Sequence, residues 1–500
     1  VRRVAAGLVD LGVAKGDRVA VLVPPGIDLA VCIYACWRMG AVVVVADAGL
    51  GVRGMSRALT SADPAYLIGI PRALAAARAL RWPGGRISTT TLQPARARLL
   101  NVRTSLDDLR RRGEGQPAPP TPTSLDEAVI GFTSGATGPA KGVSYRHHQL
   151  EAQRDALVDL YAIGPSDSLV AAFGPFALFG PAMGIPSVVP DMEVTSPGSL
   201  TAPALAEAVQ AVQATLVFAS PAALSNVAKT AGGMSPDQVA ALQGVRLLMS
   251  AGAPVPVAVL RAVSELMPNA EPHTPYGMTE VLPVADISLA QIEAAPLGNG
   301  VCVGIPVRGV EVAISALDPV GEATGPLTNE DGVVGEVCIR AAHMRDGYDK
   351  LWMTQHAASQ PAGWHRSGDV GHLDDAGRLW IEGRMGHIVT TAAGPVTPVG
   401  IEHAVSALPE VTHAAVVGVG PVGTQQLVVV VVPVDRSRLP DLAAEGLADS
   451  VRAKVDAADV AAVMTAPSLP VDKRHNSKID RSRIARWAER VLAGGRVGRI

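Results

Sequence analysis

Cysteine and aromatic residues are scarce in this chain. Of its 500 residues, only 4 are cysteine and 3% are aromatic. Cys32 and Cys36 lie one helical turn apart in an apolar segment, whereas Cys302 and Cys338 stand alone. None has the spacing of metal ligands, and so few cysteines in a large chain are typical of a reducing compartment. We therefore expect a cytoplasmic protein whose thiols are buried in its core.

Strong charge of one sign and long apolar runs are also missing. The formal net charge is -3, and no basic run is long enough to predict a nucleic-acid track, although a small anion needs only local positive charge. The apolar run at residues 427–434 has the length of a strand. The apolar segment at 29–45 is interrupted by Arg38 and Gly40. Neither predicts a helix that crosses a bilayer, so we expect a soluble protein that binds no nucleic acid.

The first residues, 1–8, have the pattern of an amphipathic helix and lack the regions of a secretory signal. Because the chain begins on Val1 inside this pattern, we expect either that the natural start lies upstream or that the start is unusual. A length of 500 residues predicts two or more domains.

Alternating strand and helix patterns dominate the first 250 residues. A strand at 18–23, a helix at 29–39 and a strand at 41–45 form the first such unit. This alternation predicts βαβ units, and therefore an α/β protein with mainly parallel, buried sheets. A further alternation begins after a helix predicted at 148–160 and continues to a strand predicted at 247–250.

The pattern changes after residue 295. Short alternating runs at 301–340 and 378–390 predict a small antiparallel β subdomain. From Gly386 onward, strands and helices predict a separate α+β unit of domain size. The glycines between 418 and 423 match a dinucleotide fingerprint in spacing, but a strand follows them, so we interpret them as a hairpin loop.

A loop rich in glycine and hydroxyl groups follows a predicted strand at 128–130 and ends at Lys141. Glycines expose backbone N–H groups, hydroxyls add donors and a lysine adds positive charge, which together form a phosphate cradle. It is not a Walker A loop, because Ala140 precedes the lysine and Gly142 follows it. Taken alone, the loop is explained equally well as a turn with a solvated lysine.

Two further stretches are candidates for ligand contacts. Three of the five phenylalanines, Phe173, Phe176 and Phe179, fall in a stretch interrupted by glycine and proline. This stretch suits the wall of an apolar pocket and ordinary core packing about equally. The turn at 251–254 follows a predicted strand, and ligands bind open α/β sheets at the carboxyl ends of strands.

Four more motifs accompany the glycine loop in the order and approximate spacing of a known superfamily. They are Tyr276-Gly277-Met278-Thr279-Glu280, Trp364 to Gly371, Gly383-Arg384 and Asn476 to Arg481. In these motifs the chain resembles the adenylate-forming superfamily of acyl-CoA synthetases, luciferases and peptide-synthetase adenylation domains. The resemblance implies a large N-terminal domain, 1–385, followed by a small mobile α+β domain, 386–500, which carries a catalytic lysine.

The resemblance implies an enzyme that uses ATP and Mg²⁺ to join a carboxylate to the α-phosphate and to release pyrophosphate. The implied phosphate contacts are Thr133, Ser134, Gly135, Thr137, Gly138 and Lys141. Such donors and cations stabilise the charge that grows as pyrophosphate leaves. Lys478 would bring positive charge between the carboxylate and the α-phosphate.

Other residues would hold the rest of the nucleotide. Glu280 offers a hard oxygen ligand to Mg²⁺, and Thr279 offers a hydroxyl to the α-phosphate. Asp369, when ionised, accepts from both ribose hydroxyls, and Arg384 adds a donor. The implied adenine slot and its neighbours are Gly252, Ala253, Pro254, Tyr276 and Gly277.

Within the superfamily, three longer runs look like the bacterial β-lactone synthetases of olefin and β-lactone biosynthesis. They are Phe176 to Met192, Thr274 to Val284 and Arg474 to Arg481. This likeness implies that a 2-alkyl-3-hydroxy fatty acid is adenylated and that its own hydroxyl then closes a β-lactone. Intramolecular attack replaces a bimolecular step. We also expect assembly with other enzymes of the same lipid pathway.

Three departures from the acyl-CoA synthetase pattern favour the lactone hypothesis over thioester chemistry. Gly386 stands where Asp or Lys is usual at the hinge, and the loop at 390–398 differs from the type that receives CoA. Leu178 and Phe179 also occupy a motif that usually holds a histidine. The alternatives are a fatty acyl-CoA or acyl-AMP ligase and, less directly, a non-catalytic subunit of a lipid-processing assembly.

Overall fold

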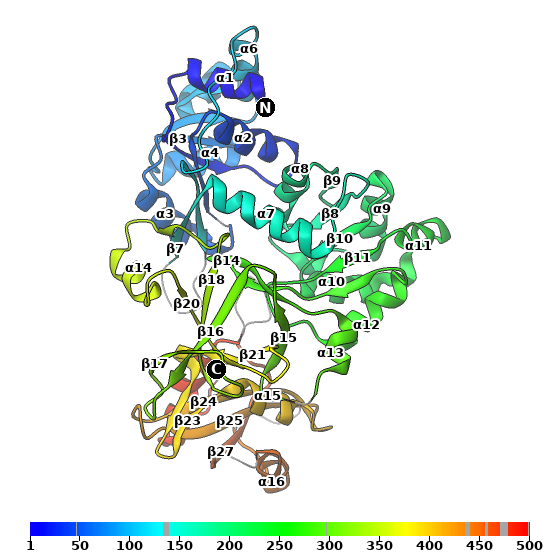
Figure 1. Ribbon diagram of the computed structural model, residues 1–500, viewed down its shortest axis with the longest axis vertical. Coiled ribbons are helices and arrows are strands. Elements are labelled where there is room, and N and C mark those ends of the chain that lie inside the picture. Colours follow the sequence, from blue (N-terminus) through cyan, green and yellow to red (C-terminus); the bar gives the residue numbers. More distant parts are fainter. Residues whose placement is uncertain are drawn as a thin grey trace.

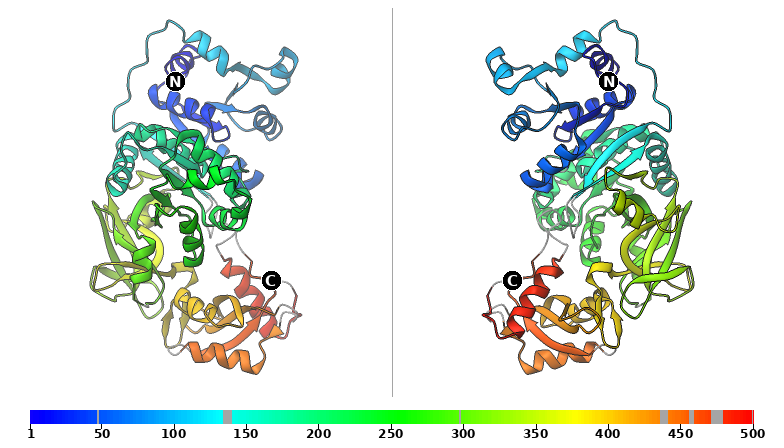
Figure 2. Two further views of the ribbon diagram at one scale, coloured as in Figure 1. Left: turned by 90° about the vertical axis from the view of Figure 1, so that its right-hand side faces the viewer. Right: turned by 90° about the vertical axis from the view of Figure 1, so that its left-hand side faces the viewer.

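The computed structural model describes residues 1–46, 48–133, 140–296, 298–435, 441–455, 459–470, 479–498 and 500. In Figure 1 the N-terminal residues lie at the upper end of an elongated molecule and the elements after residue 386 at its lower end. The same order along the long axis is visible in both side views of Figure 2.

The first eight-stranded sheet has the order β19-β7-β6-β2-β1-β3-β4-β5. Its strands are β1 (Arg18–Leu22), β2 (Val42–Ala46), β3 (Tyr66–Gly69), β4 (Gly85–Ser88), β5 (Val102–Ser105), β6 (Glu127–Thr133), β7 (Lys141–Arg146) and β19 (Gly347–Tyr348). The first six strands run parallel, and β7 and β19 add antiparallel strands at one edge. Because both faces are buried, the strands are rich in valine and isoleucine.

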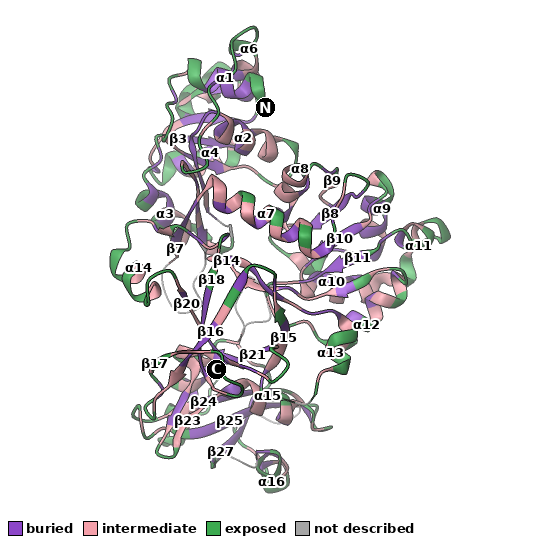
Figure 3. Ribbon diagram, in the orientation of Figure 1, coloured by how far each residue is buried: buried purple, intermediate pink, exposed green. Residues whose placement is uncertain are grey.

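Helices cover both faces of this sheet. One face packs against α1 (Arg2–Asp10), α2 (Ile27–Arg38) and α6 (Leu106–Arg112). The other packs against α3 (Gly51–Ala62), α4 (Pro71–Ala79) and α5 (Pro94–Leu100). Figure 3 shows the strands mainly buried and the outer faces of several helices exposed.

A five-stranded parallel sheet follows, with the order β12-β11-β10-β8-β9. Its strands are β8 (Leu169–Ala172), β9 (Ser187–Val188), β10 (Leu216–Ala219), β11 (Leu247–Met249) and β12 (Glu271–His273). The accompanying helices are α7 (His147–Tyr161), α8 (Phe179–Met183), α9 (Ala202–Val212), α10 (Pro221–Thr230), α11 (Pro236–Leu242) and α12 (Val257–Leu266). These two sheets confirm the predicted parallel-rich α/β architecture.

The second eight-stranded sheet is antiparallel, as the runs at 301–340 and 378–390 predicted. Its strands are β13 (Tyr276–Met278), β14 (Val281–Asp286), β15 (Val301–Pro306), β16 (Val310–Leu317), β17 (Ala323–Thr328), β18 (Gly335–Ala341), β20 (His365–Leu373) and β21 (Leu379–Arg384). Two short helices, α13 (Leu289–Ala294) and α14 (Trp352–Ala358), interrupt it.

After residue 386 the chain forms the predicted α+β unit. A four-stranded sheet contains β24 (Val411–Val419), β25 (Gln426–Pro433), β26 (Asp441–Leu442) and β27 (Val460–Thr465). Beside it lie the hairpin β22 (Val389–Thr391) and β23 (Gly394–Val396) and the helices α15 (Pro398–Ser406), α16 (Glu445–Lys454) and α17 (Arg481–Leu492). β24 and β25 pair antiparallel, so the segment between them is a hairpin loop, which confirms that interpretation; Gly420 and Gly423 lie in the loop, whereas Gly418 lies in β24 and pairs with Leu427.

The boundaries of the first predicted elements fall within two residues of those observed. No helix or strand was predicted at 71–112, where α4, β4, α5, β5 and α6 occur. Cys32, Cys36 and Cys338 are buried, as predicted, but Cys302 is only partly buried. Burial raises the pKa of Cys32 and of Cys338 to about 12, so both are protonated at neutral pH. Among the helices in the described ranges, none is long and apolar enough to cross a bilayer.

Candidate active site

A cavity of about 2940 Å³ lies where the three large sheets meet. Its wall includes residues that follow β1, residues of β10 and residues of the β13–β14 turn. Residues 479–482, which lead into α17, also line it. The cavity therefore draws on both parallel sheets, on the antiparallel sheet and on the C-terminal unit.

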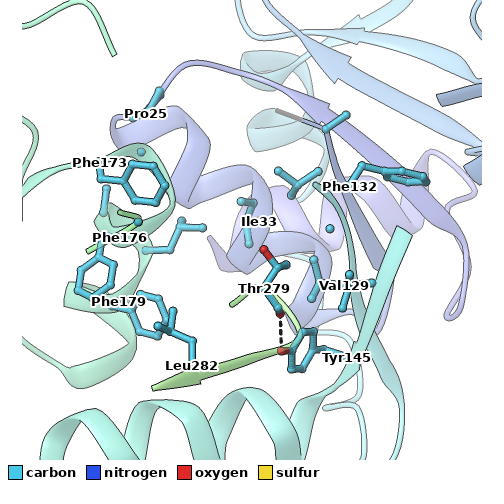
Figure 4. A pocket seen from close by; sticks show the side chains of 18 of the residues that line it. Pro25, Ile33, Val129, Phe132, Tyr145, Phe173, Phe176, Phe179, Thr279 and Leu282 are labelled. Atoms are coloured by element: carbon cyan, nitrogen blue, oxygen red, sulfur yellow. Dashed lines mark hydrogen bonds between the residues drawn. The ribbon is translucent and has the colours of Figure 1, made fainter. Parts of the chain in front are cut away.

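One end of the cavity is apolar. Phe173, Phe176 and Phe179 lie together on one side of it in Figure 4, and Val129 and Tyr145 lie on another side. Phe176 is buried and stacks on Phe218, with ring centroids 3.8 Å apart. The sequence suited two explanations of this stretch about equally, a pocket wall and ordinary core packing. The structure shows that the stretch does both.

The turn after β11 contributes part of the predicted adenine slot. Gly252 and Ala253 line the cavity, whereas Pro254 is exposed and is not among the lining residues. Gly252 has a φ of 99°, a left-handed conformation that favours glycine. A side chain here would therefore strain the turn.

Asp369 lies at the centre of a polar cluster beside the cavity. It is buried, and its Oδ2 accepts a hydrogen bond of 2.6 Å from the Tyr276 hydroxyl. Arg384 forms an ion pair with it, at 2.9 Å from Nε to Oδ1. Asp369 and Arg384 face each other across β20 and β21, so the pairing register alone brings them together. A carboxylate offers about four lone-pair sites, so acceptor capacity remains.

Thr279 and Glu280 form the turn between β13 and β14, and both line the cavity. The Tyr145 hydroxyl donates to the Thr279 carbonyl at 2.6 Å, as Figure 4 shows. The Tyr348 hydroxyl donates to Glu280 Oε1 at 2.8 Å. The turn is thus held from two tyrosines, while its side chains face the cavity.

The glycine loop is described only at its ends. Lys141 begins β7 and lines the cavity, and its Nζ lies 5.2 Å from the centre of the Tyr348 ring. Thr133 ends β6, but its side chain is outside the description. Ser134, Gly135, Thr137, Gly138 and the predicted catalytic Lys478 also lie outside the described residues. Gly277 lines the cavity beside the turn.

The donor set suits a magnesium ion that is bound together with a nucleotide. Within the described ranges, no three or more His, Cys, Asp or Glu side chains form a group that could hold a metal alone. Mg²⁺ commonly binds through one or two carboxylates plus substrate phosphates. Glu280 offers one carboxylate, and the positive charge of Lys141 would attract the phosphates. One carboxylate oxygen and the phosphates would therefore suffice.

Several residues of this region were not identified as site residues from the sequence. Glu336 accepts from the backbone N–H of Gly368 at 2.9 Å and pairs with Arg366, so it fixes the part of β20 that leads to Asp369. His365, in the same run, is buried, and desolvation followed by the charge of Arg345 lowers its pKa to about 3. The only sequence signal for a role of His365 in the site was its place in the run from Trp364 to Gly371.

His387 also lines the cavity beside the hinge position. Desolvation lowers its pKa to about 4, and the charges of Arg481 and Arg384 act in the same direction. His387 is therefore neutral at physiological pH.

Comparison with known proteins agrees with this geometry. Residues 1–349 match the family model described as AMP-binding enzyme. The chain is 36% identical over 512 residues to the olefin beta-lactone synthetase of Xanthomonas campestris pv. campestris, which covers 97% of this chain and 88% of that protein. It is 26% identical over 430 residues to the long-chain-fatty-acid–CoA ligase FadD13 of Mycobacterium tuberculosis, covering 83% of this chain and 78% of the relative.

Solved structures share the fold. The amide bond synthetase McbA from Marinactinospora thermotolerans superposes with a TM-score of 0.75 at 26% identity, over 97% of this chain and 93% of that one. The chain therefore belongs to the AMP-binding enzyme family and is an adenylate-forming ligase.

Proposed function

We propose that the protein uses ATP and Mg²⁺ to adenylate a 2-alkyl-3-hydroxy fatty acid and then closes a β-lactone. The carrying observation is the similarity over nearly the whole chain to an olefin beta-lactone synthetase. Family membership supports the use of ATP. The single cavity that joins the phenylalanine cluster to Glu280 and Lys141 is consistent with an acid that has a long apolar part.

In the first step a carboxylate oxygen attacks the α-phosphorus, and the bond to the β-phosphate breaks. We propose that Lys141 and the loop at 133–138 hold the β- and γ-phosphates, and that Thr279 contacts the α-phosphate. We propose that Lys478 would stabilise the negative charge that builds at attack. A magnesium ion held by Glu280 would neutralise phosphate charge.

The nucleoside is held at the other side of the same site. Asp369 would accept from the ribose hydroxyls with the capacity that Tyr276 and Arg384 leave free. Gly252 and Ala253 would face the adenine ring, with Pro254 at the outer end of the turn.

In the second step the 3-hydroxyl oxygen attacks the acyl carbon, AMP leaves and the hydroxyl proton is released. The two reacting groups belong to one molecule, so the cavity need only hold them folded toward each other. We propose that this happens without CoA and that residues 386–500 form a mobile domain that carries Lys478. The two apolar cores of residues 386–500 contain no described residue before Val389, which supports a domain boundary near residue 386.

A fatty acyl-CoA ligase is the second candidate, favoured by the similarity to the Mycobacterium tuberculosis ligase. The test supplies a racemic 2-alkyl-3-hydroxy fatty acid, ATP and Mg²⁺ without CoA and follows pyrophosphate release and, by NMR, the lactone. We expect both products in the absence of CoA. Product that forms only after CoA is added would identify the second candidate. Accumulation of acyl-adenylate without lactone would refute the cyclisation step.

A further inference from the structure

Arg345 is a buried cation with neutral partners. Its side chain is 3% exposed, and it forms no ion pair with a carboxylate among the described residues. Its Nη1 donates to Gln355 Oε1 at 2.6 Å. Its Nη2 lies 3.3 Å from both Ser359 Oγ and His365 Nδ1. A buried charge without a counter-ion is costly, so its position calls for an explanation.

The guanidinium of Arg345 lies over the ring of Tyr348, with Cζ 4.1 Å from the ring centre. Lys141 Nζ lies 5.2 Å from the same centre. Cation–π attraction strengthens when both groups are removed from water, and Tyr348 is 8% exposed. The ring is therefore held by two positive charges.

The backbone of Tyr348 is fixed independently of its ring. The residue pairs with Val143 where β19 joins β7, and its N–H donates to Gln355 Oε1 at 3.1 Å. Gln355 thus binds both Arg345 and Tyr348. The strand pairing, the hydrogen bond to Gln355 and the ring contact with Arg345 together restrict the direction of the Tyr348 hydroxyl.

That hydroxyl donates to Glu280 Oε1 at 2.8 Å, and the backbone N–H of Arg345 donates to the Glu280 carbonyl at 2.7 Å. Among the described residues, no hydrogen-bond donor contacts the other carboxylate oxygen, Oε2. One oxygen of Glu280, a residue that lines the cavity, is thus held by a protein donor, and the other keeps its acceptor capacity.

We propose that Tyr348 and Arg345 are positioning residues for the metal ligand Glu280. Tyr348 orients the carboxylate directly, and Arg345 acts through Tyr348 by holding its ring and through the Glu280 backbone. This inference rests on the proposed role of Glu280 as the magnesium ligand. Partners of this outer kind commonly change metal affinity by about 10–100-fold when removed.

The test measures Mn²⁺ binding by electron paramagnetic resonance, in the full-length protein with a non-hydrolysable ATP analogue bound. Tyr348→Phe keeps the ring and removes only the donor. We expect its Mn²⁺ dissociation constant to rise about 10-fold or more. Tyr161→Phe is the matched control, because the buried Tyr161 hydroxyl also donates to a carboxylate, Asp286 Oδ1 at 2.9 Å, away from the cavity. We expect this control to bind Mn²⁺ as the parent protein does.

Arg345 is tested by a pair of variants. Arg345→Met removes the cation, whereas Arg345→Lys retains one that can lie against the ring. We expect Mn²⁺ affinity to fall in the methionine variant and to recover in part in the lysine variant. A purely structural role would lower thermal stability in both without this recovery. If Arg345→Met does not fold, Tyr348→Phe still decides the question.

Glu280→Gln separates the two proposals. Weak Mn²⁺ binding in this variant together with normal binding in Tyr348→Phe would overturn the positioning role and leave the metal role of Glu280 intact. Normal binding in both variants would overturn both roles. If Mn²⁺ binding weakens in both variants as expected but the parent protein makes no lactone, only the proposed cyclisation is overturned.

Discussion

Acidification should destabilise the folded protein through His365. This side chain is 2% exposed, and its neighbour Arg345 approaches Nδ1 to 3.3 Å, so a second positive charge is strongly disfavoured. Desolvation, then Arg345, and more weakly Lys141 lower the pKa to about 3. An unfolded histidine has a pKa of about 6.5.

The sign follows from which state binds the proton first. Between pH 6.5 and 3 the unfolded chain is protonated at this residue and the folded protein is not, so stability falls as the pH falls through this window. At pH 5, about 1.5 units below the unfolded pKa, the loss relative to pH 7 is about 2 kcal/mol.

The measurement compares chemical denaturation of the parent protein and of His365→Gln at pH 7 and pH 5. Glutamine keeps an acceptor for Arg345 but does not titrate. We expect the variant to lose about 2 kcal/mol less than the parent between the two pH values. The double difference cancels groups that do not interact with this site. An equal pH dependence in both proteins, or an NMR titration of His365 with a midpoint above pH 5, would refute the reasoning.

Three further outcomes are expected. Lys478→Ala should suppress pyrophosphate release while ATP binding, measured by calorimetry, stays nearly intact, because the proposed role of this lysine is to stabilise transition-state charge; equal loss of both would contradict this role. Phe176→Ala should cost about 3–5 kcal/mol in denaturant unfolding, since the buried ring stacks on Phe218, and a cost below 1 kcal/mol would contradict it. Arg481→Ala should remove the ion-pair partner of the buried Glu402, which then retains the hydrogen bond from the backbone N–H of Val416, at a cost of about 3–5 kcal/mol. Limited proteolysis within 386–500 should then accelerate, and unchanged cleavage would argue against the prediction.

The architecture followed from local patterns. Valine-rich runs between amphipathic helices predicted the parallel sheets, because strands buried on both faces must be apolar along their whole length. The antiparallel runs after residue 295 were found from a different signal, the alternation of apolar and polar residues between turn residues. The short elements between 71 and 112 escaped because strands and helices of four to nine residues carry too little periodicity.

The candidate site could be predicted only where its residues belong to recognisable runs. Glu280 and Asp369 stand in such runs, and the pairing of β20 with β21 then places Arg384 beside Asp369. Tyr348 and Arg345 carry no such signal. They reach the site because the two-residue strand β19 leaves the antiparallel sheet and pairs with β7, about two hundred positions earlier in the chain. That pairing is a tertiary event with no local signature.

This topology also has a consequence for how the site is held. Glu280 lies in the β13–β14 turn of the antiparallel sheet, and Lys141 begins β7, which lies next to the edge strand β19 of the first sheet. Tyr348 touches both, through its hydroxyl and through its ring. A shift between the two sheets would break one of these contacts, so the cation–π contact and the hydrogen bond together resist such a shift. Tyr348, which neither motif contains, therefore links the proposed metal ligand Glu280 to Lys141, the lysine proposed to bind phosphate.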